Sequence, residues 1–361
     1  MKIGFFTDSY FPKIDGVTYT IKLWRAELEA QGHEVYIVYP DGDYDPDERE
    51  IPVTSLPNPF YRGYRIPLFR RPSTLPDLDV VHCHGPASVS LLGRYYAWRH
   101  DLPTVYTHHT PVEEYFDQGV KFESVADALA KVYLPIEESY LESFDAVTAS
   151  TERIDRDINH IPLPVGIDMD FFEPTQTRWY EDRTVIGYSG RLSKEKNVDE
   201  ILEVARQLPE YDFVIVGEGP YAETLKRNPP ANVTFRDFLP REELPIFYSS
   251  IDTFVTASTA DTLGLSTLEA NACGTPIAAA DTPPFDETIG SENGERFEYG
   301  NIGAMVEAID SCLDSTYETR AAVKRYDVDD TMSRLTTLYE NPQATARELT
   351  DEIPSKTPPA R

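Results

Sequence analysis

Short apolar segments alternate with amphipathic ones along most of this 361-residue chain, and this alternation constrains the fold more than any other feature. In the first half the expected strands lie at 2–7, 34–39, 79–84 and 104–107, with a loop at 9–16 and a helix at 18–31. A strand, a helix and a second strand in succession form a βαβ unit, whose strands are parallel. We therefore expect a parallel sheet covered by helices, with ligands gathering at the carboxyl ends of its strands.

The same alternation starts again after a proline-rich, aperiodic stretch at 161–166, which we interpret as a linker. The second series has expected strands at 184–189, 212–216, 232–235, 253–257 and 275–279, and expected helices at 198–208, 241–249 and 265–272. A chain of this length can form two domains that each bury a core. The sequence thus predicts an α/β protein with two Rossmann-like, doubly wound domains facing across a cleft.

The predicted N-terminal domain covers 1–164 and the predicted C-terminal domain covers 165–324. A helix at about 325–340 is expected to pack back on the N-terminal domain. Residues 341–361 mix proline, threonine and charge without periodicity, and we expect a disordered tail there.

Acidic residues dominate the charge of the chain. Asp and Glu number 62 against 33 Lys and Arg, which gives a net charge of -29. Such an excess fits a protein kept soluble in concentrated salt, and we expect a halophilic source. It would repel nucleic acid phosphates, so nucleic acid is not an expected partner.

Neither a disulfide framework nor a membrane span is expected. Cys83, Cys273 and Cys312 are scattered without CxxC spacing, which predicts reduced core residues. The start of the chain becomes polar by Thr7 and Asp8, too soon for a signal peptide, and no apolar run reaches ~18 residues. We expect a cytoplasmic protein, at most bound to the inner face of a membrane.

The most specific pattern lies between Asp261 and Pro276, with the sequence DTLGLSTLEANACGTP. It places two carboxylates, Asp261 and Glu269, eight residues apart, the first in a loop before a helix and the second within it. Carboxylates accept hydrogen bonds from sugar hydroxyls, and the first amides of a helix can face a phosphate. The alternative is a capped helix with a solvated acid, but Glu269 has small and apolar neighbours, among which an unpaired charge is costly.

This segment resembles the E-x7-E signature of family-four glycosyltransferases and the E-A-x-A-x-G-x-P run of that family. The resemblance implies the GT-B fold and the transfer of a hexose-type sugar from a nucleotide-sugar donor. It also implies that Glu269 binds the ribose and that the first acid lies near the donor sugar. Here the first acid is Asp261, whose shorter side chain alters the sugar contact. Leu263, Gly264 and Leu265, at the start of the helix, are assigned to the donor site with them.

A second match, GRLSKEKN at 190–197, resembles the family's G-R-L-x-x-x-K-N segment. It implies that Arg191 and Lys196 hold the donor diphosphate. Two cations at a strand-to-helix turn suit a leaving group that gains negative charge. Each residue alone would fit an ordinary charged turn, but the pair in register with Asp261 and Glu269 favours a donor site.

Three weaker matches also bear on the donor. Gly16, after the first strand, resembles the family's glycine loop, where backbone approaches the phosphates closely. Glu218, in the GEGP turn at 217–220, is either a nucleotide contact or part of the turn geometry. Leu239 lies where the family's backbone meets the base.

Four of the seven histidines fall in two clusters. His82 and His84 alternate on one face of an expected strand, with Cys83 on the other. His108 and His109 end the next expected strand.

The sequence YTHHT at 106–110 resembles the family's T-Y-H-T, which implies that His109 lies beside the donor sugar and the acceptor. We therefore assign His109 and Asp261 to catalysis. One alternative is that His84 is simply a hydrogen-bonded core residue. A zinc site made of the four imidazoles is another, although no carboxylate or cysteine completes a familiar metal spacing.

A basic, aromatic stretch at 51–76 contains no Asp or Glu. Its expected acceptor or membrane contacts are Tyr61, Arg62, Tyr64, Arg65, Arg70 and Arg71. Such side chains suit an anionic lipid face or a phosphorylated lipid acceptor, and the alternative is a loop whose arginine stems pack on the core. The segments 262–264 and 8–17 also resemble relatives that glycosylate diacylglycerol-type lipids, which favours a membrane lipid or a lipid-linked glycan as acceptor.

The resemblance implies front-side displacement with retention of the anomeric configuration and without a metal. The leaving phosphate would help to deprotonate the acceptor, the nucleotide-sugar is a substrate, and no cofactor is expected. Two rival functions stay open at this point. One is a nucleotide-sugar epimerase of the same fold, and the other is a degenerate nucleotide-binding protein in which Asp261 marks lost activity.

Overall fold

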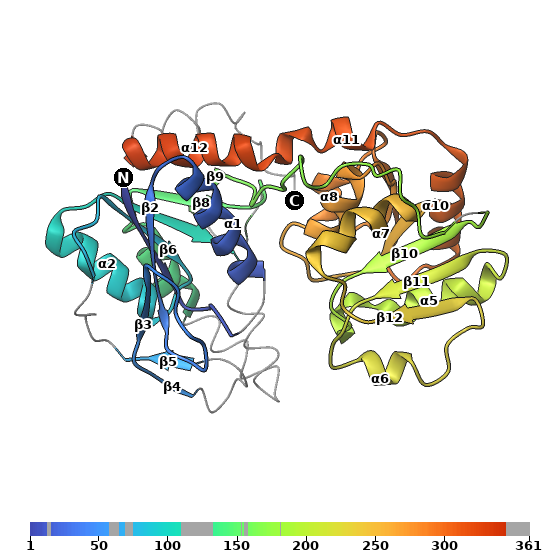
Figure 1. The fold of residues 1–361 in the computed structure, drawn as a ribbon, viewed down its shortest axis with the longest axis horizontal. Helices are drawn as coiled ribbons and strands as arrows, with labels where there is room; N and C mark the ends of the chain where they lie inside the picture. The colour runs from blue at the N-terminus through green and yellow to red at the C-terminus, as the bar shows by residue number, and fades with distance from the viewer. Residues whose placement is uncertain are drawn as a thin grey trace. The chain divides into compact units, whose positions relative to one another are not determined.

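The computed structural model describes residues 1–12, 16–57, 65–68, 75–109, 133–152, 154, 158–180 and 182–343. They form two compact units, each with its own parallel sheet (Figure 1). Unit 1 combines Met1–Leu163 with the described residues from Met332 onward, and unit 2 is Pro164–Thr331.

The sheet of unit 1 has the strand order β3-β2-β1-β6-β7-β8-β9 among the described residues, and every neighbouring pair is parallel. Its strands are β1 (Lys2–Thr7), β2 (Glu34–Pro40), β3 (Glu50–Val53), β6 (Val80–His84), β7 (Thr104–His108), β8 (Ala146–Ala149) and β9 (Ile161–Pro162). A separate antiparallel hairpin consists of β4 (Ser55–Pro57) and β5 (Arg65–Pro67). The central strands β1 and β6 are almost wholly buried because both faces of the sheet are covered.

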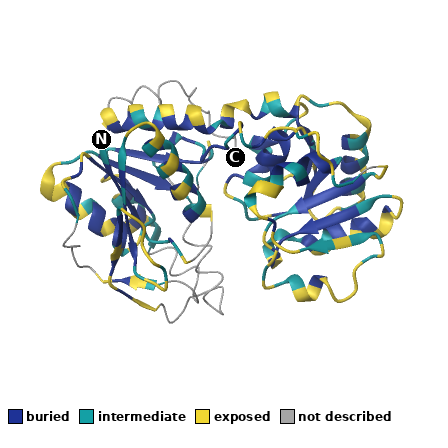
Figure 2. Ribbon diagram, viewed as in Figure 1, coloured by how far each residue is buried: buried dark blue, intermediate teal, exposed yellow. Residues whose placement is uncertain are grey.

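Helices cover the two faces of this sheet, and its strands are buried between them (Figure 2). The helices are α1 (Gly16–Ala30), α2 (Ser88–His100), a helical segment at 133–141 and α12 (Val328–Glu340). Trp24 of α1 and Tyr339 of α12 both contact the ring of His82. Cys83 points to the opposite face, where its thiol meets the Ser90 carbonyl of α2. The predicted alternation of these β6 side chains is therefore confirmed.

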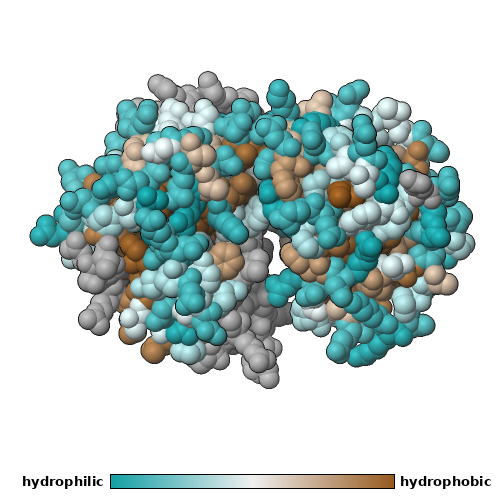
Figure 3. All heavy atoms as spheres, viewed as in Figure 1, coloured by the Kyte–Doolittle hydropathy of each residue, from teal (hydrophilic) through white to brown (hydrophobic). Residues whose placement is uncertain are grey.

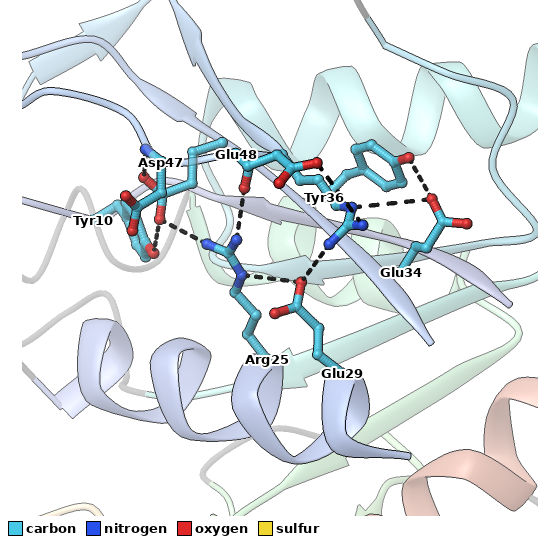
Figure 4. Close-up of polar contacts among 9 residues, drawn as sticks. Tyr10, Arg25, Glu29, Glu34, Tyr36, Asp47 and Glu48 are labelled. Carbon is cyan, nitrogen blue, oxygen red and sulfur yellow. Dashed lines mark hydrogen bonds and ion pairs between the residues drawn. The ribbon is translucent and has the colours of Figure 1, made fainter. Parts of the chain in front are cut away.

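A polar network joins α1 to the edge strand β3 and to the segment after β1 (Figure 4). The buried Glu50 carboxylate accepts hydrogen bonds from the Tyr10 hydroxyl at 2.7 Å and from Arg25 Nη1 at 2.9 Å. Arg25 also pairs with Glu29 of its own helix. Because Glu50 is buried, its charge requires these partners, and they fix the segment that leaves β1.

The sheet of unit 2 has the strand order β12-β11-β10-β13-β14-β15, again parallel throughout the described residues. Its strands are β10 (Val185–Ser189), β11 (Asp212–Val216), β12 (Val233–Arg236), β13 (Thr253–Thr256), β14 (Ile277–Ala280) and β15 (Gly294–Phe297). This is the strand order of a Rossmann sheet, with its switch point between β10 and β13. Ligands of such sheets bind beyond the carboxyl ends of the strands.

Two apolar cores lie on the opposite faces of this sheet. One packs α7 (Leu244–Ser250), α8 (Leu265–Ala272) and α9 (Phe285–Thr288) on β10, β13 and β14. The other packs α5 (Val198–Gln207), α6 (Ala222–Leu225) and α10 (Ile302–Asp314) on the same sheet. The remaining elements are α11 (Thr319–Ala322) and 3-10 turns at Lys194–Lys196, Arg241–Glu243 and Lys324–Tyr326.

Several element boundaries differ from the predictions. The first helix begins at Gly16 instead of residue 18, and β7 extends through His108. Residues 161–162 of the expected linker form β9 instead. They run parallel to β8, and the next residue, Leu163, donates from its backbone N–H to Ala149 O of β8. The helix expected at 241–249 is divided into a 3-10 turn and α7, with Pro245 in the first turn of α7.

The three cysteines are free and buried, as predicted. The helix expected at about 325–340 begins at Val328 after a 3-10 turn. Residues 344–361 of the expected tail lie outside the described residues. No helix in the described ranges is long and apolar enough to cross a membrane.

Candidate functional site

The loops that follow β10, β11 and β13 are bonded to one another at the carboxyl edge of the unit 2 sheet. Leu192 N donates to Glu218 O at 2.8 Å, and Thr259 N donates to Glu195 O at 3.1 Å. Asn197 ends the 3-10 turn in the left-handed region and donates from its amide to Ala257 O at 3.0 Å. These bonds hold Arg191, Lys196 and Asp261 on one rigid edge.

The GEGP turn at 217–220 requires glycine at its first position. The φ of Gly217 is 138°, and a Cβ at this position would lie 2.0 Å from the Gly190 carbonyl oxygen. Only glycine allows this close approach of two backbones. The Glu218 side chain is exposed, and its carbonyl supplies the bond to Leu192. The glycine pattern therefore has a structural cause, and a nucleotide contact of Glu218 stays a prediction.

Lys196 lies at the centre of this edge. Its ammonium nitrogen is 2.8 Å from Asp261 Oδ1, 2.8 Å from Ala260 O and 3.3 Å from Ser258 Oγ. Arg191 is exposed, and its carbonyl accepts a bond from the buried Tyr188 hydroxyl at 3.2 Å. The two cations assigned to the diphosphate thus differ, because Lys196 is held by three acceptors and Arg191 extends into solvent.

Glu269 is buried within α8. Its Oε2 accepts a hydrogen bond from the Tyr248 hydroxyl at 2.9 Å. Burial raises the pKa of Glu269 to about 7, although the Tyr248 bond and the nearby Arg241 charge both lower it. The Glu269 carboxyl is therefore buried and can accept a further hydrogen bond.

The start of α8 presents backbone to the same edge. Gly264 is the residue before the helix, has a φ of 74°, and has no side-chain cap. A Cβ on Gly264 would lie 2.7 Å from the Phe285 ring. Leu263 and Leu239 are buried beneath this edge, and Leu265 is half-buried. The first amides of α8 are therefore positioned for an anion beyond the carboxyl ends of the strands.

His82, His84 and His109 lie together in unit 1, on β6 and just after β7. His84 Nδ1 lies 2.9 Å from His109 Nε2, and the two rings are stacked. His82 lies 2.6 Å from the Tyr339 hydroxyl on one ring nitrogen and 2.6 Å from Thr107 Oγ1 on the other. Burial holds the pKa of both His82 and His84 well below the usual value.

Both buried imidazoles of β6 are therefore neutral. His84 is a core residue whose Nδ1 bonds to His109 Nε2, and this bond positions the ring of His109. Within the part of the chain that the structure describes, no cluster of three His, Cys, Asp or Glu side chains could hold a metal.

Asp8, directly after β1, was not among the predicted site residues. Its carboxylate accepts from Ala87 N and Val89 N, both at 2.9 Å, and so caps the start of α2. Burial raises the pKa of Asp8 to about 6, although these bonds lower it. Gly16 begins α1, and a Cβ there would meet no described atom within 4 Å, so no steric need for glycine is visible within the described chain.

Arg65 is the one residue of the predicted basic patch that the structure describes. Its guanidinium donates to Ser55 Oγ at 2.7 Å and pairs with Asp41 at 3.2 Å. These bonds fasten the β4–β5 hairpin to the end of β2, and a contact of Arg65 with an acceptor or a membrane stays a prediction. The other predicted patch residues, Tyr61, Arg62, Tyr64, Arg70 and Arg71, lie outside the described residues.

Two family models match this chain. The model described as "Glycosyltransferase Family 4" matches residues 14–168, and the model "Glycosyl transferases group 1" matches residues 170–329. Strand β1 (Lys2–Thr7) precedes the first match, and the other described strands of both sheets lie within the two matches.

Relatives of similar length support this assignment. The chain is 28% identical to an alpha-monoglucosyldiacylglycerol synthase of Streptococcus pneumoniae, over 88% of this chain and 80% of the relative. It is 26% identical to a GDP-mannose-dependent alpha-mannosyltransferase of Mycobacterium tuberculosis, over 78% of this chain and 79% of the relative.

Solved structures share the fold. Sucrose-phosphate synthase from Thermosynechococcus elongatus superposes with a TM-score of 0.71 at 20% identity, over 95% of this chain and 99% of that one. Anabaena HepE in complex with UDP superposes with a TM-score of 0.69 at 16% identity, over 94% of this chain and 100% of that one. The chain belongs to glycosyltransferase family 4, with the GT-B fold, and is a nucleotide-sugar-dependent hexosyltransferase.

Proposed function

We propose that this enzyme transfers a hexose, with retention of the anomeric configuration, from a nucleoside-diphosphate sugar to a lipid hydroxyl at a membrane surface. The observation that carries the donor half is the carboxyl edge of the unit 2 sheet. There Lys196 bonds to the loop after β13, and Glu269 lies in α8, the helix that begins after this loop. The lipid half is supported by the names of two relatives, the alpha-monoglucosyldiacylglycerol synthases of Streptococcus pneumoniae and Acholeplasma laidlawii.

Each donor group has a suitable partner at this edge. The Lys196 ammonium and the first amides of α8 would stabilise the diphosphate as its charge increases on departure. Glu269 would accept a hydrogen bond from a ribose hydroxyl, and this bond would offset the cost of burying the Glu269 carboxylate. With positive charge already supplied by side chains and amides, we expect no metal requirement.

In unit 1, the His84 bond fixes the ring of His109. We assign His109 to a position beside the donor sugar and the acceptor, where a fixed imidazole orients a hydroxyl for reaction. The leaving phosphate oxygen then accepts the proton of the acceptor hydroxyl, and the new glycosidic bond forms on the face from which the diphosphate leaves.

A surface of unit 1 supports contact with a membrane. Leu91, Tyr95 and Trp98 are exposed on α2, at 45%, 47% and 69%, and their spacing places them on one face of the helix. The helix contains no Asp or Glu and ends with Arg99 and His100, although the whole chain has a net charge of -29. An aromatic and cationic helix face suits the interface of an anionic lipid leaflet.

The β4–β5 hairpin adjoins this helix, because α2 contacts β5. Leu56, Ile66 and Leu68 on and beside the hairpin are exposed, and Leu56 is paired with Ile66 across the two strands. Figure 3 shows apolar atoms at the surface near α2 and near this hairpin. We name Leu56, Ile66, Leu68, Leu91, Tyr95 and Trp98 the apolar face of unit 1, and we propose that it meets the inner face of a membrane.

The transfer reaction is tested with purified enzyme, a panel of nucleotide-sugars and either a lipid extract or soluble sugars. We expect nucleoside diphosphate release with one donor, a glycolipid of α-configuration from an α-linked donor, and full activity in EDTA. A modified free sugar without an acceptor would instead indicate an epimerase, and a soluble glycoside as the only product would contradict the lipid acceptor.

The membrane contact is tested by replacing Trp98 with Gln and measuring binding to vesicles with and without anionic lipid. We expect vesicle binding about ten-fold weaker, because burial of a large apolar side chain is lost, with unchanged transfer to a detergent-dispersed acceptor. Tyr299→Gln, a substitution at an exposed aromatic residue of unit 2, is the control and should bind vesicles like the wild type. Equal binding by all three proteins would refute the contact.

A further inference from the structure

Lys196 makes as many bonds as an ammonium group can donate. A lysine ammonium has three N–H donors, and three acceptors surround this one: Asp261 Oδ1, Ala260 O and Ser258 Oγ. The side chain of Lys196 is 16% exposed. A phosphate oxygen can therefore bond to this ammonium only by replacing one of the three acceptors.

The three acceptors differ in how easily they can leave. Ala260 O is backbone, in a segment fixed by the bond from Thr259 N to Glu195 O. Ser258 is completely buried, and its hydroxyl also accepts from Ala260 N at 3.3 Å. Asp261 is a flexible side chain at the rim, 26% exposed. Asp261 is thus the acceptor that can rotate away without disturbing the loops.

We propose that Asp261 and the donor diphosphate compete for Lys196, so that diphosphate binding releases the Asp261 carboxylate to accept a hydroxyl of the donor sugar. This inference rests on the proposed function, because it assigns an order of events within the same donor site. The exchange makes the sugar contact conditional on a bound diphosphate. The same competition opposes binding of the nucleoside diphosphate product. That product carries no sugar, so the released Asp261 carboxylate would have no sugar hydroxyl from which to accept a hydrogen bond.

The competition predicts opposite effects on two ligands. In Asp261→Asn the competing charge is absent, so free nucleoside diphosphate should bind about five-fold more tightly, the equivalent of ~1 kcal/mol for a partly exposed ion pair. The nucleotide-sugar should gain less, because the variant loses a carboxylate that accepts from the sugar. The transfer rate should fall at least ten-fold.

The measurement is calorimetric titration at fixed salt with UDP and with GDP, and then with the matching nucleotide-sugar. Glu195→Gln is the matched control, since it removes one negative charge next to Lys196 from a carboxylate that bonds to Ser193 instead. A double-mutant cycle with Lys196→Met isolates the pair. In the Lys196→Met background, the gain from Asp261→Asn should disappear.

Three results would overturn the competition while leaving the proposed function in place. They are unchanged or weaker nucleoside diphosphate binding in Asp261→Asn, an equal gain in Glu195→Gln, and a gain that persists in the Lys196→Met background. If thermal unfolding shows that Asp261→Asn is unstable, Asp261→Ser replaces it in the binding measurements. A wild type that binds neither nucleotide and transfers no sugar would instead refute the proposed function, and the competition with it.

Discussion

Glu269 carries a conflict between stability and binding. It is buried, its bond from Tyr248 is the one hydrogen bond to its carboxylate that the described residues provide, and burial raises its pKa to about 7. A carboxyl whose folded pKa exceeds its ordinary value favours folding while protonated and opposes folding once ionised. Its contribution to stability is therefore present at low pH and lost as the pH rises from about 4.5 to about 7. A ribose hydroxyl would supply the missing partner.

Glu269→Gln should separate these two effects. The amide oxygen keeps the Tyr248 bond without a charge, so at pH 8 the variant should be more stable than the wild type, by roughly 3 kcal/mol at most. At pH 4.5 the two free energies of unfolding should agree. Nucleotide affinity should fall at least ten-fold, because a charged acceptor is lost.

Urea unfolding at several pH values measures the first effect, and nucleotide titration measures the second. Glu203→Gln, at a half-exposed carboxylate paired with Arg206, should show neither. A difference between Glu269→Gln and the wild type that does not grow with pH would contradict the assignment.

At this scale the sequence pattern singled out four charged residues of unit 2 but not the residues that bond to them; their roles toward the donor stay a prediction. Asp261, Glu269, Arg191 and Lys196 stand in a pattern of fixed spacing, so a sequence can reveal them. Tyr248 could not be found in this way, because it lies on the buried face of a different helix, and only the packing of α7 on α8 brings its hydroxyl to Glu269.

Among the elements, the turn after β11 has the strictest backbone requirement. Gly217→Ala should lower the free energy of unfolding of unit 2 by more than 2 kcal/mol, because it combines a positive φ with a Cβ 2.0 Å from Gly190 O. It should also weaken nucleotide binding, since the displaced Gly190 precedes Arg191.

Gly300→Ala is the matched control for this substitution. Gly300 has a φ of 78°, and a Cβ there meets nothing within 4 Å, so the variant carries the conformational cost alone, about 1 kcal/mol. Chemical unfolding followed by tryptophan fluorescence compares the two variants. Equal losses would show that the contact with Gly190 is relieved by a backbone shift.

The strands that were predicted agree with the structure to within two residues at each end, as at Lys2–Thr7 and Asp212–Val216. Strands β3, β8 and β15 were not predicted, although β8 is a fully buried run. Short elements could not be predicted in this way. Strand β9 has only two residues, one of them proline, and exists because β8 offers an unpaired edge. That cause is tertiary and leaves no periodic pattern.

For the whole molecule, the acidic excess predicts a dependence on salt. A net charge of -29 destabilises a compact chain by self-repulsion, and at 1 M ionic strength the Debye length is ~3 Å. We propose that the protein is adapted to concentrated salt. The unfolding midpoint of each unit should rise by about 5 °C between 0.1 and 1 M KCl, the equivalent of ~2 kcal/mol.

Differential scanning calorimetry across a KCl series measures this effect, with sucrose at equal osmolality as the control. The sucrose series should raise the midpoints less, because sucrose does not screen charge. Midpoints that are constant or that fall with KCl would count against salt adaptation.

Helix α12 begins in unit 2 and ends in unit 1, where the Tyr339 hydroxyl bonds to His82. On a ribosome, every residue of unit 2 has been synthesised once Thr331 is added, whereas unit 1 still lacks a covering helix for one face of its sheet. Unit 1 is thus synthesised first but completed last, because the partner of His82 lies 257 residues later in the chain. One face of the unit 1 sheet therefore stays uncovered by α12 while the whole of unit 2 is synthesised, and His82 lacks its Tyr339 bond throughout that time.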